Sequence, residues 1–414
     1  MAGSEASTIT DVTPPAGATV RPFRALHFDP RRVPIGDAIA PPFDVISGVE
    51  RAALAARSPY NMVHLILPRR GDEPHVHELL CAWRESGVLV LDDEPAYYWL
   101  EERYLAPDGT RHTRTGFIGL VGIEPYERSV VLPHERTREG PVQGRLELLR
   151  ATRAHLSPIF GVYHDPQGRA EDALVRHRDP EPMLEATAGD GTASTLWRVR
   201  SGHEAVADVL AASTVLVADG HHRYETALRY WRERGGGDQP AAYLPVHLAS
   251  ADDGLVIYPT HRIVAGVADD VAAGLDGALR DQGLDVHEVA DPVAALDAVG
   301  GRAALAVVRD GRPALLAVDG DGTDAALAQD RLLGPVLGLD PAAVARTDRI
   351  TYSHRADEAA AHATGDRIAI LLRAPTIAQV ERAALQGRTL PQKSTYFYPK
   401  TPDGFVMYDL DSCG

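Results

Sequence analysis

Five consecutive residues, Asp219-Gly220-His221-His222-Arg223, carry side chains that could hold an anion. The apolar run STVLVA before them is typical of a buried strand, and YETALRYWRER after them is typical of a helix that ends at three glycines. A helix N-terminus exposes N–H groups and positive partial charge, which favours phosphate binding. Gly220 would let the backbone approach a ligand closely, and Arg223 could grip phosphate oxygens with two hydrogen bonds. The five residues alone fit equally well an Asp219 helix cap beside surface basic side chains.

A candidate proton acceptor lies upstream, where Glu135 follows His134 in the segment VVLPHERT. A carboxylate within hydrogen-bond reach of a hydroxyl can take its proton during phosphoryl transfer. The rest of that reaction depends mainly on positioning and on neutralising charge. Taken alone, Glu135 fits an ordinary solvated surface glutamate better than a catalytic one.

Further polar candidates lie near the C-terminus, where Lys393, Ser394 and Thr395 occur together in LPQKSTYFYPK. Lysine supplies a point charge and the two hydroxyls can donate hydrogen bonds, so the group suits a phosphate. A plain polar loop is the alternative.

The segment GLVIYPTHRIV adds a second tier of substrate candidates, which are Tyr258, Thr260, His261 and Arg262. Arg262 could hold a substrate carboxylate through paired hydrogen bonds, or form a structural salt bridge. Core packing would explain Tyr258 equally well.

Three segments resemble one known enzyme family in the same order along the chain. ADGHHRYETAL resembles the phosphate-binding signature of the ParB/sulfiredoxin superfamily and, within it, the VDGHHR-type loop of archaeal free serine kinase. The Pro133-His134-Glu135 segment resembles the one that bears that kinase's catalytic glutamate. The stretch from RIAILLRAP to PQKSTYFYPK resembles its C-terminal strand, helix and phosphate-contacting lysine-threonine segment. The resemblance covers residues 115 to 400.

This resemblance implies roles for individual residues. It implies Glu135 as general base with His134 beside it, phosphate or nucleotide contacts from the DGHHR loop, and similar contacts from Lys393, Ser394 and Thr395. It also implies substrate contacts from Arg145, Tyr258, His261, Arg262 and Tyr396. No metal-ligand set is implied.

Departures from the family pattern bear on the substrate. Sulfiredoxins have a cysteine where this chain has His221, so sulfinic acid repair lacks its sulfur nucleophile. Val142 and Gly144 stand where Lys and Asp are expected ahead of Arg145, and Tyr396-Phe397 replaces an expected Arg-His pair. These changes point to an altered acceptor or to lost activity.

The whole chain, from RPFRALHF and APPFDVIS onward, also resembles a widespread bacterial family of domain-of-unknown-function proteins. The resemblance to that family implies no particular reaction. Its N-terminal prolines and neighbours could build a lid or an extra wall, or simply order the packing; they are Pro41, Pro42, Phe43, Asp44 and Asn61.

Composition narrows the class of protein. The formal charge of −16 disfavours nucleic acid and anionic membranes as partners. Two cysteines, Cys81 and Cys413, fit neither a disulfide framework nor a cysteine zinc site, and a reducing compartment suits them. No run of about 18 apolar residues suggests a membrane span, and the N-terminus lacks a signal-peptide pattern. We therefore expect a cytoplasmic protein.

The predicted fold class is mixed α/β (α+β). We expect a flexible tail over residues 1–18, an N-terminal α+β region over 19–114, a ParB/sulfiredoxin-like core over 115–265, and a C-terminal α/β domain over 266–414 that completes the active site. Two strands around the Pro-Asp-Gly turn at 107–109 predict a hairpin, and residues 165–190 read as a polar surface insertion. Thr376 and Gln379 predict a capping box.

The function expected from these observations is a kinase that moves a phosphate from ATP or ADP, with Mg²⁺, to the hydroxyl of free serine or a related hydroxy amino acid. Two alternatives stay open. One is a nucleotide-binding switch of ParB type without transfer. The other is a zinc hydrolase built from some of the 17 histidines, although the chain has no HExxH motif.

Overall fold

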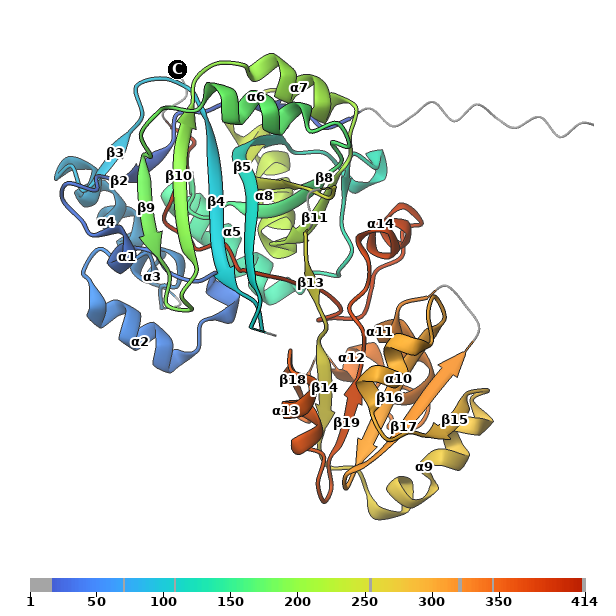
Figure 1. Ribbon diagram of the computed structural model, residues 1–414. Helices are drawn as coiled ribbons and strands as arrows, with labels where there is room; N and C mark the ends of the chain where they lie inside the picture. The colour runs from blue at the N-terminus through green and yellow to red at the C-terminus, as the bar shows by residue number, and fades with distance from the viewer. Residues whose placement is uncertain are drawn as a thin grey trace, which may run out of the picture.

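The computed structural model describes residues 17–69, 71–107, 109–252, 255–318, 322–344 and 346–411. Most of the expected N-terminal tail, and Cys413, lie outside these ranges. Ala18 is already packed, because it is buried and its N–H donates to the carbonyl of Ser213 at 2.9 Å. The chain forms a larger body and a smaller one, each built on a sheet (Figure 1). The expected mixed α/β class is confirmed.

The larger body contains a nine-stranded mixed sheet in the order β6-β11-β8-β12-β5-β4-β10-β9, with β1 also paired to β5. The strands are β1 (Val20–Arg21), β4 (Tyr97–Leu105), β5 (Arg111–Gly122), β6 (Val131–Leu132), β8 (Ile159–Tyr163), β9 (Leu184–Thr187), β10 (Ala193–Val199), β11 (Val215–Asp219) and β12 (Tyr243–Ser250). The β6–β11 and β8–β12 pairs are parallel and the other pairs are antiparallel.

Side chains alternate along each strand and so point to both faces of the sheet. Both faces are buried, because each packs against a hydrophobic core. On β4, Tyr97 and Trp99 face one core, while Tyr98 and Leu100 face the other. The first core also holds α6 (Arg169–His177), α7 (His203–Ala211) and part of α8 (His221–Glu233). The second holds α5 (Glu139–Thr152) and the N-terminal elements. Figure 1 shows α5 and α8 behind the strands and α6 and α7 above them.

The N-terminal region is a set of short elements packed on the second core. They are β2 (Leu26–Phe28), α1 (Ile35–Ala38), the 3₁₀ turn η1 (Phe43–Val45), α2 (Gly48–Arg57), α3 (Val63–Ile66), α4 (Glu73–Glu85) and β3 (Leu89–Leu91). The turn η2 (Tyr126–Arg128), strand β7 (Ala154–His155) and turn η3 (Pro240–Ala242) connect the larger elements.

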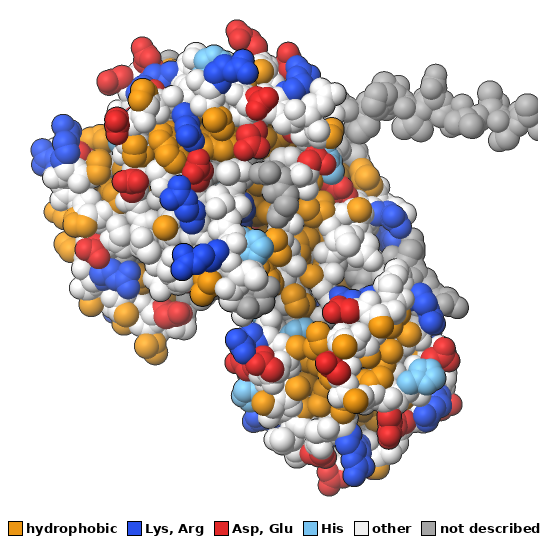
Figure 2. Space-filling view, viewed as in Figure 1, with side chains coloured by type: hydrophobic (Ala, Val, Ile, Leu, Met, Phe, Trp, Pro, Cys, Tyr) orange, Lys and Arg blue, Asp and Glu red, His pale blue; other side chains and the backbone are white. Residues whose placement is uncertain are grey.

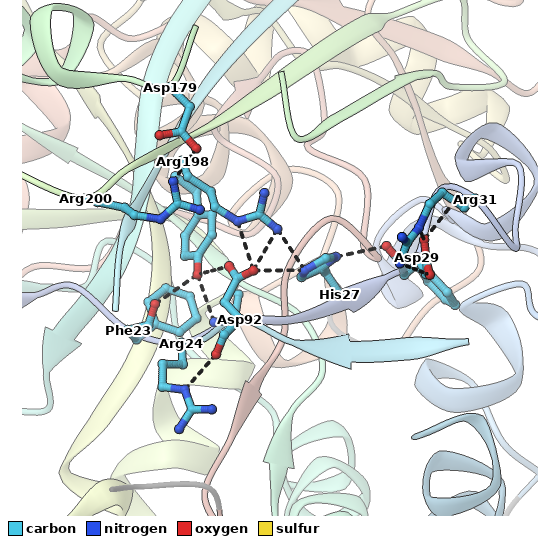
Figure 3. A network of polar contacts seen from close by, with 12 residues as sticks. Phe23, Arg24, His27, Asp29, Arg31, Asp92, Asp179, Arg198 and Arg200 are labelled. Atoms are coloured by element: carbon cyan, nitrogen blue, oxygen red, sulfur yellow. Dashed lines mark hydrogen bonds and ion pairs between the residues drawn. The ribbon is translucent and has the colours of Figure 1, made fainter. Parts of the chain in front are cut away.

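A polar cluster around Asp92 joins this N-terminal region to the large sheet (Figure 3). Its carboxylate accepts hydrogen bonds from Arg198 at 2.7 and 2.9 Å and from the Tyr98 hydroxyl at 2.7 Å, and His27 Nε2 lies 3.1 Å from it. Burial alone would raise the pKa of Asp92, but these partners hold it well below its usual range.

The smaller body is a six-stranded sheet in the order β15-β17-β16-β19-β14-β18. Its strands are β14 (His261–Val264), β15 (Asp285–Glu288), β16 (Ala303–Arg309), β17 (Arg312–Val318), β18 (Ile350–Ser353) and β19 (Ile368–Leu371). Its helical elements are α9 (Asp269–Asp281), α10 (Pro292–Ala298), α11 (Asp324–Leu327), the π-helical turn η4 (Ala328–Leu333), α12 (Pro341–Val344) and α13 (Ala356–Ala361).

After β19 the chain returns to the larger body through α14 (Ile377–Leu385), β20 (Tyr396–Phe397) and β21 (Tyr408–Asp409), with β20 paired to β13 (Ile257–Tyr258). Residues 405–410 pack in the second core of the larger body. The C-terminal sequence is therefore shared between the two bodies.

Several local predictions are confirmed. Strands β4 and β5, which flank the Pro-Asp-Gly sequence, form the predicted antiparallel pair, and the predicted capping box of Thr376 and Gln379 begins α14. The prediction for residues 165–190 was wrong, because α6 packs in a core and β9 forms the edge of the large sheet. Its polar sequence reflects the exposed half of an amphipathic helix and of an edge strand.

The visible surface carries interspersed acidic and basic side chains, without one large patch of either sign (Figure 2). Within the described residues, no helix combines the length and apolar character that crossing a bilayer requires.

Candidate active site

The predicted strand, loop and helix around the DGHHR sequence are present as β11, Gly220 and α8. Gly220 has φ 95°, which is a left-handed conformation that favours glycine. A Cβ there would lie 2.7 Å from Ile159 Cγ2 on the neighbouring β8. Glycine is therefore required both by the turn and by the packing, and the first turn of the 13-residue α8 opens beside Asp219.

Asp219 forms the acidic centre of this loop. Its carboxylate is paired with Lys400 Nζ and accepts a hydrogen bond from Arg223 Nη2 at 3.1 Å. Burial would raise the pKa of Asp219, but Lys400 and Arg223 hold it well below its usual range. Asp219 is therefore ionised and committed to two cations.

Arg223 is directed into the protein. Its Nη1 donates to the carbonyl of Pro158 at 2.6 Å and lies 3.7 Å from Asp403, and its Nη2 binds Asp219. The sequence suggested a guanidinium that grips phosphate, whereas this one is occupied by three protein partners.

His134 and His221 form a buried contact beneath the loop. The backbone N–H of His134 donates to His221 Nε2 at 3.3 Å, and His134 Nε2 lies 2.9 Å from the Thr395 hydroxyl. Burial lowers the pKa of His134 to about 4, so this imidazole is neutral near pH 7. Its role in this arrangement is to join three distant segments.

Glu135, next to His134, has a different environment. Among the described residues its carboxylate has no hydrogen-bond or ion-pair partner, although it is only partly exposed. Burial raises the pKa of Glu135, and the nearby charge of Lys393 opposes that effect. Glu135 is thus a carboxylate free to accept a proton.

These groups line one cleft of about 430 Å³. It is walled by β11 and α8, by η1 of the N-terminal region, by β18 and the residue after it in the smaller body, and by the C-terminal segment. Its lining residues are Phe43, Asp44, Val45, Glu135, Arg138, Pro141, Ala218, Asp219, Gly220, His221, His222, Arg223, Thr260, Tyr352, His354, Gln392, Lys393, Thr395, Tyr396 and Lys400.

Two cations in the cleft are uncommitted. Within the part of the chain that the structure describes, the side chains of Arg138 and Lys393 form no hydrogen bond or ion pair, and both are exposed. The Arg138 backbone N–H donates to His222 Nε2 at 3.0 Å. Lys393 has φ 57°, an uncommon conformation for a residue with a side chain and one that recurs at functional sites.

Lys400 was missed by sequence reasoning, although a signal for it exists. The chain contains only two lysines among its 42 basic residues, Lys393 and Lys400, and both line the cleft. Lys400 is positioned by Thr401, whose hydroxyl accepts from Arg114 Nη2 at 2.8 Å and lies 2.9 Å from His247. Arg114 is in turn paired with the buried Glu102.

The smaller body adds two residues that the sequence did not indicate, Tyr352 and His354. The His354 ring stacks on Tyr396, with ring centroids 3.6 Å apart and planes at 9°. Tyr396, a predicted substrate residue, therefore lies in the cleft wall. Of the suggested N-terminal wall, Phe43 and Asp44 line the cleft, whereas Asn61 binds the backbone of Asp37 and Ile39 instead.

Several predicted site residues lie outside the cleft lining. Ser394 is buried and donates to the carbonyl of Pro391 at 2.5 Å. Arg145 stacks on the Phe43 ring at 4.3 Å, and burial lowers its pKa to about 10. Its guanidinium also donates to the carbonyl of Ile66.

The other three predicted substrate residues also face elsewhere. Tyr258 and His261 line a separate cavity of about 530 Å³, and the His261 ring accepts from the N–H of Leu372. Arg262 is buried and donates to the carbonyls of Ala325 and Gln392 at 3.4 Å. Thr260, in contrast, does line the cleft.

In the described ranges, no group of three or more His, Cys, Asp or Glu side chains is arranged to hold a metal ion. The histidines of the zinc hydrolase alternative are therefore not gathered into a ligand set there.

The model of the family described as "Protein of unknown function (DUF1015)" matches residues 20–307. The chain belongs to the DUF1015 family. The match includes Asp44, Glu135 and the DGHHR loop, whereas Tyr352, His354 and both lysines lie beyond it. No curated protein matches the sequence significantly.

Solved structures with partial similarity include a free serine kinase in complex with AMP, at 16% identity and TM-score 0.39, covering 70% of this chain and 91% of that one. A conserved hypothetical protein from Pyrococcus furiosus has 16% identity and TM-score 0.38, with 70% and 95% coverage. Truncated SbnI from Staphylococcus aureus has 10% identity and TM-score 0.37, with 70% and 86% coverage.

Proposed function

We propose that this DUF1015 protein binds ATP or ADP in the 430 Å³ cleft and transfers a phosphate to the hydroxyl of free serine or a related hydroxy amino acid. One observation carries the proposal. Among the residues that the structure describes, the Glu135 carboxylate and the side chains of Arg138 and Lys393 have no partner, and all three line one cleft with a helix N-terminus. Groups left unpaired by the protein are those available to a ligand.

The phosphates would lie against the first turn of α8. Its free N–H groups and Lys393 supply positive charge from two different segments. Arg223 and Lys400 contribute indirectly, since both are engaged with Asp219. This arrangement fits phosphoryl transfer, in which charge neutralisation and positioning provide most of the rate enhancement.

Glu135 would act as the general base. As the acceptor oxygen forms its bond to phosphorus, its proton passes to Glu135 and the bond from that phosphorus to the bridging oxygen of the nucleotide breaks. The products are a phosphomonoester and ADP from ATP, or AMP from ADP. A pKa raised by burial makes Glu135 a stronger proton acceptor than an exposed glutamate.

The acceptor and Mg²⁺ would use the remaining charged groups. Arg138, at the edge of the cleft, can pair with the carboxylate of an amino acid. Asp44 is the carboxylate that could join phosphate oxygens around Mg²⁺, which commonly takes one or two protein carboxylates. Bound there, the ion would supply further neutralisation of phosphate charge.

The finer fold assignment belongs to the same proposal. We infer a ParB/sulfiredoxin-like core over residues 115–265, since β11, Gly220 and α8 lie there together with Glu135. Residues 19–114 would then form an added region that contributes one cleft wall. Residues 266–414 were expected to form one C-terminal α/β domain, but residues 405–410 pack in the larger body, so the proposed active site would be completed by the smaller body together with the returning C-terminal segment.

Phosphorus NMR tests this function directly. The protein is incubated with Mg²⁺, ATP or ADP, and serine, threonine or homoserine, and we expect a new phosphomonoester signal. Glu135→Gln should lower the transfer rate about 10²–10⁴-fold without weakening nucleotide binding. Glu127→Gln, an exposed glutamate outside the cleft, is the matched control and should behave like the wild type.

Two results would contradict the proposal in different ways. Nucleotide binding without any phosphomonoester across the panel would favour the ParB-type switch. Absence of nucleotide binding by the folded protein would remove both functions.

A further inference from the structure

Asp403 is a buried carboxylate that the proposed reaction leaves without a role. It is only 1% exposed and lies in the C-terminal segment, three residues after Lys400. Its backbone pairs in both directions with Ala40, at 2.8 and 3.1 Å, just before the η1 wall of the cleft. The carboxylate thus lies where the N-terminal region, the C-terminal segment and the phosphate loop meet.

Arg223 lies between this carboxylate and Asp219. Asp403 Oδ1 is 3.7 Å from Arg223 Nη1, which is too long for a hydrogen bond but close enough for strong attraction in buried surroundings. On its other side, Arg223 Nη2 binds Asp219 at 3.1 Å, and the buried Arg223 Nε has no hydrogen-bond partner within the described ranges. Asp219 also holds Lys400. Four side chains of alternating charge are therefore in sequence, from Asp403 through Arg223 and Asp219 to Lys400 in the cleft.

Other charges also act on Asp403. Arg145 of α5 and Asp44 of η1 lie near enough to interact with it, and Ser157 is beside it. Burial raises the pKa of Asp403 to about 7; Arg223 opposes this shift, while Asp44 and Asp219 add to it. The charge of Asp403 therefore changes within the neutral pH range.

We propose that Asp403 is a positioning residue for the phosphate loop. Because Asp403 and Asp219 share Arg223, the Arg223–Asp219 pair is weakened and Asp219 holds Lys400 more strongly against the cleft wall. The inference rests on the proposed function only in taking the cleft to be the nucleotide site. When Asp403 is neutral, Arg223 turns fully to Asp219, and Lys400 is released toward an anion in the cleft. Anion binding then becomes tighter.

Chemical labelling of the two lysines tests this inference without requiring enzymatic activity. The full-length protein is treated with an amine-reactive ester, and labelling at Lys400 and Lys393 is compared by peptide mass spectrometry. Asp403→Asn should raise the Lys400 labelling rate at pH 8 about threefold and leave Lys393 labelling unchanged. At pH 6 the variant and the wild type should agree, because Asp403 is then largely protonated.

Asp409→Asn is the control variant. Asp409 is a buried carboxylate of the same segment, but it pairs with Arg84, and neither residue lines the cleft. It should leave the Lys400 to Lys393 labelling ratio unchanged. Equal Lys400 labelling in Asp403→Asn and wild type at pH 8 would overturn the inference.

Calorimetry with Mg²⁺ and ADP separates this inference from the proposed function. Asp403→Asn should bind ADP about threefold more tightly at pH 8 and equally at pH 6. If ADP binds to neither protein while Lys400 labelling responds, the nucleotide function fails and the positioning role stands. If Asp403→Asn does not fold, the ratio of Lys400 to Lys393 labelling is followed in the wild type from pH 6 to 8.5. This ratio should fall as the pH rises through about 7. A constant ratio would refute the positioning role.

Discussion

The Asp92 cluster and the cleft are both built from charged side chains contributed in part by the N-terminal region, yet they differ in how those charges are paired. Around Asp92, Arg198 and the Tyr98 hydroxyl each bind the carboxylate, and His27 lies in contact with it (Figure 3). In the cleft, Glu135 and Lys393 face the same space and have no internal partner among the described residues.

This difference distinguishes charged groups that stabilise the fold from charged groups that are available to bind a ligand. A buried charge that is fully paired stabilises one arrangement of the chain, and its loss is felt mainly in folding. A charge left unpaired at a concave surface contributes little to folding and is available to a ligand. The two regions should therefore respond in opposite ways to substitution.

The largest effect on stability is expected for Asp92→Ala. It leaves the Arg198 guanidinium without its buried counter-charge, so the free energy of unfolding should fall by about 3–5 kcal/mol. Urea unfolding followed by circular dichroism measures this change, and ADP affinity of the folded fraction should be unaltered. Asp238→Ala, which removes an exposed partner of Arg21, should lower the free energy of unfolding far less, because solvent screens this pair. If both variants lost the same free energy of unfolding, the buried Asp92 cluster would be no more important for stability than an exposed ion pair.

Lys393→Met should have a smaller effect than Asp92→Ala, and the effect should be on ligand binding instead of on stability. Stability should be unchanged because the ammonium has no described partner, while ADP affinity should fall about tenfold through loss of a charged hydrogen-bond donor. Arg388→Met, an exposed cation of the same C-terminal segment outside the cleft, is the matched control. Comparable affinities for the two variants would show that Lys393 does not contact the nucleotide.

The smallest effect is the acid dependence of stability. The pKa of Asp92 is lowered in the folded protein, so its contribution is present above the unfolded pKa of about 3.9 and is lost as pH falls below it. Between pH 5 and 3 the wild type should therefore lose more stability than Asp92→Asn does. Thermal unfolding across this range provides the measurement, and parallel curves would assign the acid sensitivity to other groups.

Local features of the fold were accessible from the sequence. The β4–β5 hairpin, the strand-loop-helix at residues 215–233 and the capping box at Thr376 each depend on residues close in the chain. Their signals are turn residues, apolar periodicity and capping side chains, which act over a few positions. Glu135 was likewise placed correctly beside this loop, although its chemical role stays a prediction.

The remainder depends on contacts between distant segments. Tyr352 and His354 reach the cleft from the smaller body, and neither has a local pattern that marks it. The orientation of Arg223 toward Asp403 depends on a strand-like contact between Ala40 and residue 403, which sequence periodicity does not reveal. The places of these side chains in the cleft are therefore determined by tertiary packing and not by the local sequence.

The return of the C-terminal segment to the larger body has a consequence for biosynthesis. Leu26, among the first residues described, pairs with Met407, and β21 pairs with β7 inside the larger body. Lys393 and Lys400 arrive on the same late segment. During translation, Leu26 and β7 must wait for residues 407–409 to leave the ribosome before they can pair, so the cleft cannot be assembled while the chain up to β19 is still being made.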